Sequence, residues 1–318
     1  MSRTTDRETM SQTDPNSTAA RIRVLYVVGS GRSGSTIITN ILDQYSGVVS
    51  PGELYYLWDR GLIANERCGC GKPLQSCELW HQIIEEALGT ETDPLTMVRR
   101  RNITVRTRHI FNVLFGRKSQ ARHEFLDSVA SVYRALADRT NATLIVDSSK
   151  VPVYGLALAK DPAFAVRFLH LVRDPRAVAY SWQRRKDRLV GEEPAFITQH
   201  SPYKSAMMWF GWNGIAQLLW GRSDKYLRLR YEDFTESPRE TISLILRHAG
   251  ITDTDPSAFT DATTVRLEPS HTVSGNPSRF ATGSISIRRD DEWTVKLAWK
   301  SRVITVALTW PLLLWYRY

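Results

Sequence analysis

The fold is indicated first by Ile22 to Val28, IRVLYVV, which Gly29 to Thr36, GSGRSGST, follows directly. The first segment is apolar and rich in β-branched residues, which favours a buried strand. The second is rich in glycine and serine, and Ser35 to Tyr45 then carries apolar residues at helical spacing. The order strand, loop, helix places free backbone amides and a helix dipole where they favour an anion.

Three further apolar runs, at residues 143–146, 166–172 and 226–230, end in the polar residues DSSK, RDP and YED. Helical patterns follow the last two runs, and strands that alternate with helices predict a mostly parallel sheet covered on both faces. Ligands bind at the carboxyl edge of such sheets. We therefore predict an α/β fold, a three-layer sandwich, with these polar residues gathered at one edge.

The composition is that of one globular domain. The chain has 318 residues, of which 42% are hydrophobic and 24% charged. Residues 1–20 are polar and lack the apolar stretch of a signal peptide, so we expect a disordered tail. Residues 21–318 are expected to form a single domain, with a helical, arginine-rich insertion at about residues 78–139. The small number of cysteines suits a cytoplasmic protein.

Two other apolar segments each allow two interpretations. Tyr203 to Trp220 is predicted to be a helix rich in tryptophan and methionine, which either packs in the core or lines a ligand site. Val303 to Tyr316 is apolar but shorter than the about 20 residues that a spanning helix needs. We expect it to pack within the protein, and peripheral membrane contact is the alternative.

The loop after the first strand has the chemistry of an anion site. Glycines let the backbone curl around an anion, and the Arg32 guanidinium can hold two oxygens. A glycine- and serine-rich turn without a ligand is the alternative. Because Ser35 follows Gly34, the lysine of a nucleoside-triphosphate P-loop is missing, and the spacing is not that of a dinucleotide-binding fold. The candidate binding residues are Ser30, Gly31, Arg32, Ser33, Gly34, Ser35 and Thr36.

Residues 32–36, RSGST, resemble the 5′-phosphosulfate loop of sulfotransferases that use 3′-phosphoadenosine 5′-phosphosulfate (PAPS). The likeness is to bacterial members nearest the carbohydrate and tyrosylprotein branches. Arg173 and Ser181, eight positions apart in RDPRAVAYS, match the residues that bind the 3′-phosphate in that family. The resemblance runs from about residue 21 to residue 299 and implies a P-loop-like α/β sandwich.

Two later segments extend the resemblance. Residues 230–233, RYED, are similar to a family segment whose tyrosine lies beside the adenine, which implies that role for Tyr231. Residues 275–280, GNPSRF, are similar to a late segment of bacterial members that closes over the nucleotide and here contains Arg279. Cytosolic members differ, because they carry lysine at the position of Arg32 and a histidine base near the position of DSSK.

The resemblance implies transfer of a sulfuryl group from PAPS to an acceptor hydroxyl. Such a reaction depends on positioning and on cations near the leaving group. Arg32 and Lys150 are the candidate cations, and no metal is required. Glu53, in PGEL, matches the catalytic glutamate of the tyrosylprotein branch and is the candidate general base, with its pKa expected to rise on partial burial. A surface role for Lys150 and a structural role for Glu53 are the alternatives.

The net charge of +9 favours anionic partners. A small-molecule kinase and a non-enzymatic binder of anionic ligands are the alternative functions. No segment resembles a nucleic-acid-binding module, so we expect no nucleic-acid partner. The acceptor is open among a carbohydrate, a glycolipid, a natural-product alcohol and a tyrosine, and the oligomeric state is open as well.

The cysteines and histidines are less informative. His81 could complete a zinc site with the cysteines, but C-x-C is tighter than the usual ligand spacing. A local disulfide and plain buried thiols are alternatives, and we prefer no metal. His170 is expected to be a core histidine, and His271 could approach the nucleotide. All cysteines lie within ten residues, at Cys68, Cys70 and Cys77.

Overall fold

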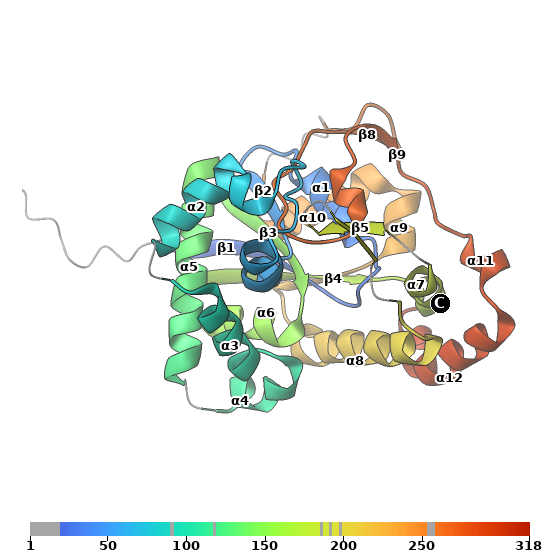
Figure 1. Cartoon of the computed structure of the whole chain (residues 1–318). Helices are drawn as coiled ribbons and strands as arrows, with labels where there is room; N and C mark the ends of the chain where they lie inside the picture. Colours follow the sequence, from blue (N-terminus) through green and yellow to red (C-terminus); the bar gives the residue numbers. More distant parts are fainter. Residues whose placement is uncertain are drawn as a thin grey trace, which may run out of the picture.

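The computed structural model describes residues 20–89, 92–116, 119–184, 187–190, 193–196, 199–252 and 258–318. Its centre is a sheet in the order β2-β3-β1-β4-β7, in which every neighbouring pair of strands is parallel (Figure 1). The predicted α/β fold is therefore confirmed. The predicted tail lies outside the described residues, apart from residue 20. The strands are β1 (Ile22–Val28), β2 (Val48–Gly52), β3 (Leu144–Lys150), β4 (Phe164–Val172) and β7 (Tyr226–Arg230).

The alternation of side chains along β1 explains the three layers. Val24, Tyr26 and Val28 belong to one buried cluster, and Leu25 and Val27 belong to another. Successive side chains of a strand point to opposite faces, so a strand that is apolar throughout must be covered on both. The first cluster includes residues of α5 (Gln120–Thr140), α6 (Pro152–Lys160) and α8 (Pro202–Trp220), and the second includes residues of α1 (Ser35–Leu42) and α10 (Pro238–Ala249).

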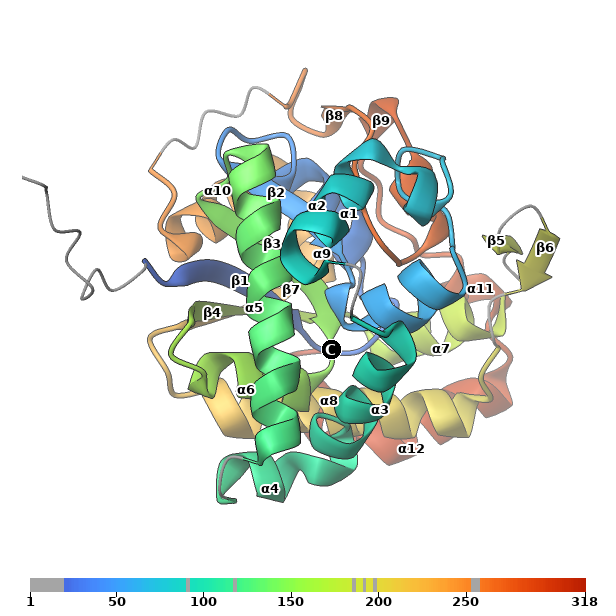
Figure 2. The ribbon, with the colours of Figure 1, turned by 60° about the vertical axis from the view of Figure 1, so that its left-hand side comes forward.

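The described residues within 78–139 are mostly helical. The last helix of this segment, α5, packs against β1 and β3, and Figure 2 shows it running along one side of the sheet. The segment thus supplies part of a sheet-covering layer. The helices before α5 are α2 (Glu78–Leu88), α3 (Pro94–Thr104), η4 (Thr107–His109) and α4 (Ile110–Leu114).

The C-terminal helix α12 (Trp299–Trp315) packs along α8 and α7 (Pro175–Gln183). The buried positions of α12 are mainly small and polar, at Ser301, Thr305 and Thr309. In the described residues, no helix is long and apolar enough to cross a membrane. The remaining elements are η1 (Leu54–Tyr56), η2 (Leu57–Ile63), η3 (Leu74–Ser76), the pair β5 (Asp187–Val190) and β6 (Glu193–Phe196), α9 (Tyr231–Glu236), the pair β8 (Thr264–Leu267) and β9 (Gly283–Ser286), η5 (Pro277–Phe280) and α11 (Trp293–Lys296).

The strand register brings the polar strand ends together. Val28 pairs with Lys150 on one side and with His170 on the other, and Val172 pairs with Arg230. The residues that follow these strands therefore lie along one edge of the sheet, where parallel α/β sheets bind ligands.

Candidate functional site

A cavity of about 530 Å³ lies at the carboxyl edge of the sheet. This volume is typical of a small-molecule site. Most of the residues predicted for the site line it: Gly31, Arg32, Gly34, Ser35, Thr36, Glu53, Lys150, Arg173, Ser181 and Tyr231.

Three predicted residues lie beside the cavity and not in its lining. Ser30 and Ser33 are buried in the loop, with 3% and 1% of their surfaces exposed. Arg279 is also buried, and its Nη2 donates to the Arg67 carbonyl at 2.6 Å. Burial lowers the pKa of Arg279 to about 10, although Glu53 opposes the shift. Arg279 is therefore placed to act on the site through charge and through the loop it anchors.

The loop after β1 has a backbone that few side chains tolerate. Gly34 caps α1 at φ 86°, and a Cβ atom there would lie 2.3 Å from the Tyr231 ring. Arg32 also has a positive φ, 66°, which is strained for a residue with a Cβ. Its guanidinium lies over the Trp182 ring, and its buried Nε has no hydrogen-bond partner among the described residues. Such a donor at a cavity wall is suited to an anionic ligand.

A second cationic group lies close to Arg32. The Arg173 Nη1 donates to the Arg32 carbonyl at 3.3 Å, so the loops after β1 and β4 are in direct contact. The Arg173 Nη2 lies 3.1 Å from Asp290 Oδ2, and the guanidinium lies over the Tyr231 ring, 4.5 Å from its centroid. Ser181 lies on α7 in the same wall. The structure thus brings both predicted anion-binding groups to one cavity.

Tyr318, the last residue of the sequence, contacts residues next to this part of the cavity lining. The Tyr318 hydroxyl donates to Glu232 Oε2 at 2.6 Å, and Arg230 lies over the Tyr318 ring. The other oxygen of Glu232 accepts the backbone N–H of Asp174 at 3.1 Å. One carboxylate therefore links the chain end, the segment after β7 and the loop after β4.

Glu53 and Lys150 form an ion pair in the lining of the cavity, in which Lys150 is buried and Glu53 is partly buried. Lys150 Nζ lies 2.8 Å from Glu53 Oε1 and also donates to the Ser148 carbonyl at 2.7 Å. Arg60 Nη1 lies 3.9 Å from Glu53 Oε2. Only 7% of the Lys150 side chain is exposed, so the alternative of a solvated surface lysine is wrong.

The expected rise in the pKa of Glu53 is wrong for this structure. Burial alone would raise the pKa, but Lys150, Arg60 and Arg279 together outweigh burial and hold it below the ordinary value. Glu53 is therefore a carboxylate at neutral pH. A carboxylate of this kind can accept a proton, and its basicity is reduced as long as the cations stay beside it.

Asp147 fixes the end of β3 behind Lys150. It is fully buried and accepts the Ser149 backbone N–H at 2.7 Å, and it also accepts a hydrogen bond from the Tyr133 hydroxyl. Burial raises the pKa of Asp147 to about 6, while the bonds from Ser149 and Tyr133 limit the rise. The DSSK segment is therefore a buried continuation of the strand that aims Lys150 at the cavity.

Several lining residues were not predicted from the sequence. Arg60, on η2, lies over the Tyr56 ring with its guanidinium carbon 3.9 Å from the centroid. His200 and Trp182 stack with their ring centroids 4.4 Å apart. The predicted helix at residues 203–220 serves both of its proposed roles: some of its tryptophans are buried in the core, and other residues line the cavity. The further lining residues include Met208, Trp212, Asp290 and Arg288.

His170 is a core histidine, as expected. It is fully buried, and its Nδ1 and Nε2 lie 2.5 and 2.8 Å from the Tyr226 hydroxyl and Asn213 Oδ1. Burial lowers the pKa of His170 to about 4, so the ring is neutral at physiological pH. His170 does not line the cavity.

Residues 25–255 match the sulfotransferase family. The chain belongs to this family. Its fold is similar to that of the sulfotransferase domain from the curacin biosynthetic pathway, with a TM-score of 0.52, 18% sequence identity and coverage of 92% of this chain and 98% of that domain. The sulfotransferase domain of the olefin synthase from Synechococcus PCC 7002 has a TM-score of 0.49 and 19% identity, over 92% of this chain and 95% of that domain. None of the curated proteins compared with the chain matches it significantly.

Membership of the family fits the lining of the cavity. A sulfotransferase requires a site for a sulfuryl donor and an adjacent site for an acceptor, and both cationic and aromatic side chains line the cavity. The chain is a transferase. Its candidate active site consists of the loop after β1, the part of the cavity lining that contains Arg173, and the Glu53–Lys150 pair.

Proposed function

We propose that this sulfotransferase transfers a sulfuryl group from PAPS to the hydroxyl of a small-molecule acceptor. One observation supports the donor above all: two cationic anion sites, around Arg32 and Arg173, share one cavity. PAPS carries anionic groups at both ends of its ribose. In the proposed complex, the loop of residues 29–36 and Lys150 hold the phosphosulfate, Arg173 and Ser181 hold the 3′-phosphate, and Tyr231 lies beside the adenine.

The proposed chemistry is an in-line displacement at sulfur. The acceptor oxygen forms a bond to sulfur while the bond between sulfur and the bridging oxygen breaks. The electron pair of that bond stays on the bridging oxygen, which Lys150 and Arg32 stabilise. The acceptor proton passes to Glu53. The products are the sulfate ester and adenosine 3′,5′-bisphosphate, and the step requires no metal.

The Glu53–Lys150 pair bears on the order in which the two substrates bind. When Lys150 turns toward the donor, Glu53 loses its nearest cation, and its pKa rises as a result. The general base therefore becomes stronger only after the donor binds. This argument supports a sequence in which PAPS enters before the acceptor.

Aromatic and apolar side chains line the cavity alongside its cations. Tyr56, Trp182 and Trp212 line it together with Met208. Aromatic and apolar side chains favour apolar groups and the carbon-rich parts of sugars, so we favour an apolar alcohol or a glycolipid as the acceptor. A screen of acceptor hydroxyls with radiolabelled PAPS identifies the class, and transfer to none of the apolar alcohols or glycolipids contradicts this part of the proposal.

We also propose that the outer face of α12 contacts an anionic membrane surface. Trp299, Trp310, Leu314 and Trp315 are each more than half exposed, whereas the buried side of the helix is mostly small and polar. Exposed cations stand nearby, including Lys300. Aromatic residues beside lysine are typical of interfacial helices. This placement suits an acceptor that resides in lipid. The cytoplasmic location stays a prediction.

Calorimetry tests the proposed donor. Adenosine 3′,5′-bisphosphate is expected to bind without magnesium, and Arg173→Ala is expected to weaken it at least about tenfold by removing a charge-assisted contact. Arg266→Ala is the control, because Arg266 is 72% exposed in the strand β8 and does not line the cavity. Binding of ATP that depends on magnesium, with no binding of the bisphosphate, would support a kinase in its place.

The variant Glu53→Gln tests the proposed base. It keeps the shape of the side chain and is expected to bind the bisphosphate, while kcat falls about 10²- to 10⁴-fold because the acceptor proton has no receiver. Glu268→Gln is the control, because its side chain is 68% exposed at the surface. Normal turnover of Glu53→Gln removes Glu53 from the mechanism.

A further inference from the structure

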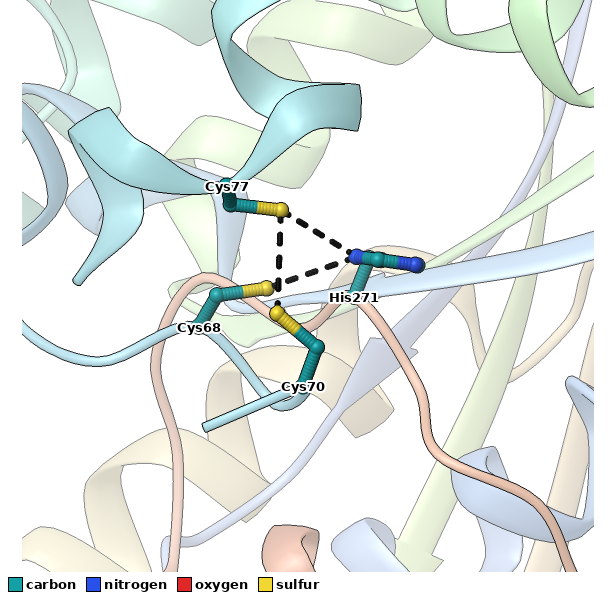
Figure 3. Close-up of side chains that lie close together, drawn as sticks. All are labelled: Cys68, Cys70, Cys77 and His271. Carbon is teal, nitrogen blue, oxygen red and sulfur yellow. Dashed lines mark hydrogen bonds between the residues drawn. The ribbon is translucent and has the colours of Figure 1, made fainter. Parts of the chain in front are cut away.

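Three cysteines and one histidine converge outside the cavity lining. Cys77 Sγ lies 3.2 Å from His271 Nδ1, and Cys68 Sγ lies 3.7 Å from the same nitrogen (Figure 3). Cys70 Sγ lies 3.8 Å from Cys77 Sγ. All of these donor atoms lie within 4.8 Å of one another. His81, which the sequence suggested as the fourth ligand, is exposed and does not belong to the cluster. His271 stands in its place.

The distances have the size of the edges of a zinc tetrahedron. Bonds of about 2.3 Å from zinc to sulfur and about 2.0–2.1 Å from zinc to nitrogen imply S···S edges of about 3.8 Å and S···N edges of about 3.6 Å. The S···S contact of 3.8 Å equals the first length, and the S···N contacts of 3.7 and 3.2 Å lie on either side of the second. A disulfide between Cys70 and Cys77 would need about 2.05 Å between the sulfurs. All three thiols are free.

Backbone contacts hold the two ligand-bearing loops together. The Gly69 N–H donates to the Thr272 carbonyl at 3.0 Å, and Trp80 Nε1 donates to the His271 carbonyl at 2.8 Å. A Cβ atom on Gly69 would lie 2.6 Å from the Ser270 carbonyl oxygen, so only glycine allows this approach. The ligands are therefore presented by a preorganised frame, as a metal site requires.

The C-x-C spacing is compatible with this frame. A tight turn follows Cys68, whose carbonyl accepts the Gly71 N–H at 2.8 Å, and Gly71 has φ 89°. Figure 3 shows the Cys68 and Cys70 side chains pointing toward the same centre. Cys77 is the N-cap residue of α2, so the start of the helix fixes its position.

We propose that Cys68, Cys70, Cys77 and His271 bind one structural zinc ion. Thiolates and an imidazole are the ligands that zinc prefers, and four protein ligands leave no position for a reacting water. This proposal replaces the sequence-based preference for no metal at the cysteines. It leaves the transfer chemistry free of metal.

The position of the site indicates what the ion stabilises. His271 lies a few residues before Gly275, Asn276 and Ser278, which line the cavity. On the other side, Arg67 precedes Cys68, and its carbonyl accepts the bond from Arg279. A zinc ion here would fasten the segment at residues 275–279 to the loop at residues 67–77. Loss of the ion is therefore expected to loosen the wall of the cavity.

Metal analysis of the full chain, purified without a polyhistidine tag, tests the proposal directly. We expect one zinc per chain, and cobalt exchange is expected to give thiolate-to-metal charge-transfer absorption together with the intense visible bands of a tetrahedral site. Removal of the metal with a chelator is expected to lower Tm, and added zinc to restore it.

Matched histidine variants locate the fourth ligand. His271→Asn is expected to lose most bound zinc, whereas His81→Asn keeps it. If His271→Asn does not fold, Cys70→Ser provides a second test, because Cys70 is less buried than the other cysteines.

Two results on the wild-type chain overturn the zinc proposal. One is purified protein without metal in which native alkylation modifies all three thiols, and the other is a Cys70–Cys77 disulfide found by mass spectrometry. Neither result bears on bisphosphate binding, which is measured separately.

Discussion

At the level of single residues, two cations of the site have carboxylate partners inside the protein. Glu53 holds Lys150, and Asp290 holds Arg173. Under the proposed function, both cations exchange a carboxylate for an oxygen of the donor. These two ion pairs neutralise Lys150 and Arg173, which lie close to other cations. Burying either cation without a partner would cost free energy.

The pH dependence of kcat/KM tests whether Lys150 exchanges Glu53 for the donor. Cations hold the pKa of free Glu53 below its ordinary 4.5, so the acid limb of kcat/KM for the donor is expected below that value. Activity is full above the limb and falls as pH drops through it, because protonation removes the base. With the donor saturating, Lys150 is occupied, and the limb of kcat/KM for the acceptor is expected at higher pH. Identical limbs in both profiles contradict the exchange, and circular dichroism at each pH checks folding.

Asp290→Asn tests the partner of Arg173. The ion pair is partly exposed, since 34% of the Asp290 side chain is accessible, so its removal is expected to tighten adenosine 3′,5′-bisphosphate about 2- to 5-fold. Calorimetry measures the change. Asp291→Asn is the control, because Asp291 pairs with Arg289 instead. Weaker binding in Asp290→Asn means that Asp290 positions the ligand and does not compete with it.

Residues carried by local motifs could be predicted from the sequence, and residues joined only by tertiary structure could not. Arg173 and Tyr231 directly follow a strand and Arg32 lies in the loop after one, so the strand pattern alone places them at one edge. Asp290 and His271 reach their partners across 117 and 203 residues of chain, respectively. Proximity in sequence favoured the wrong histidine, His81.

At the scale of elements, the site depends on how α1 begins. The left-handed Gly34 lets the Tyr231 ring lie directly against the loop, and this contact joins the loop after β1 to the start of α9. The helix then offers its first free amides to the cavity.

Gly34→Ala is expected to lower stability by about 1–2 kcal/mol from backbone strain alone, and to displace Tyr231 as well. Bisphosphate affinity is expected to fall by at least about tenfold, measured by calorimetry. Gly283→Ala carries similar strain at φ 79° but meets open space, so it separates strain from the clash. Equal losses of affinity in the two variants contradict a role for the Gly34–Tyr231 contact.

The sequence predicted four of the five strands of the central sheet, but not all of their limits. Apolar runs marked β1 and β4, and α10 matches its predicted range, with Gly250 at its end. The short β2 escaped notice because it contains Pro51 and ends at Gly52. The strand β3 runs on to Lys150 because its polar residues are buried by hydrogen bonds, which hydropathy does not reveal.

At the scale of the whole molecule, the outer face of α12 distinguishes one side of the protein. Trp310→Ser combined with Trp315→Ser is expected to weaken binding to anionic phosphatidylglycerol vesicles at least about tenfold, since both exposed rings would insert into the interface. Cosedimentation measures the bound fraction. Phe115→Ser, an 82% exposed residue next to α4, is the control. Unchanged vesicle binding in the double variant contradicts membrane contact through α12.

The bond between Tyr318 and Glu232 has a practical consequence for anyone preparing this enzyme. Because α12 exposes aromatic side chains, it is a natural segment to remove when expression is to be improved. Cutting before α12 would also strip the support from the segment around Tyr231 and uncover the buried carboxylate of Glu232. A shortened chain with better yield is therefore a poor reference for kinetics, and replacement of surface tryptophans by serine is the safer route to a well-behaved sample.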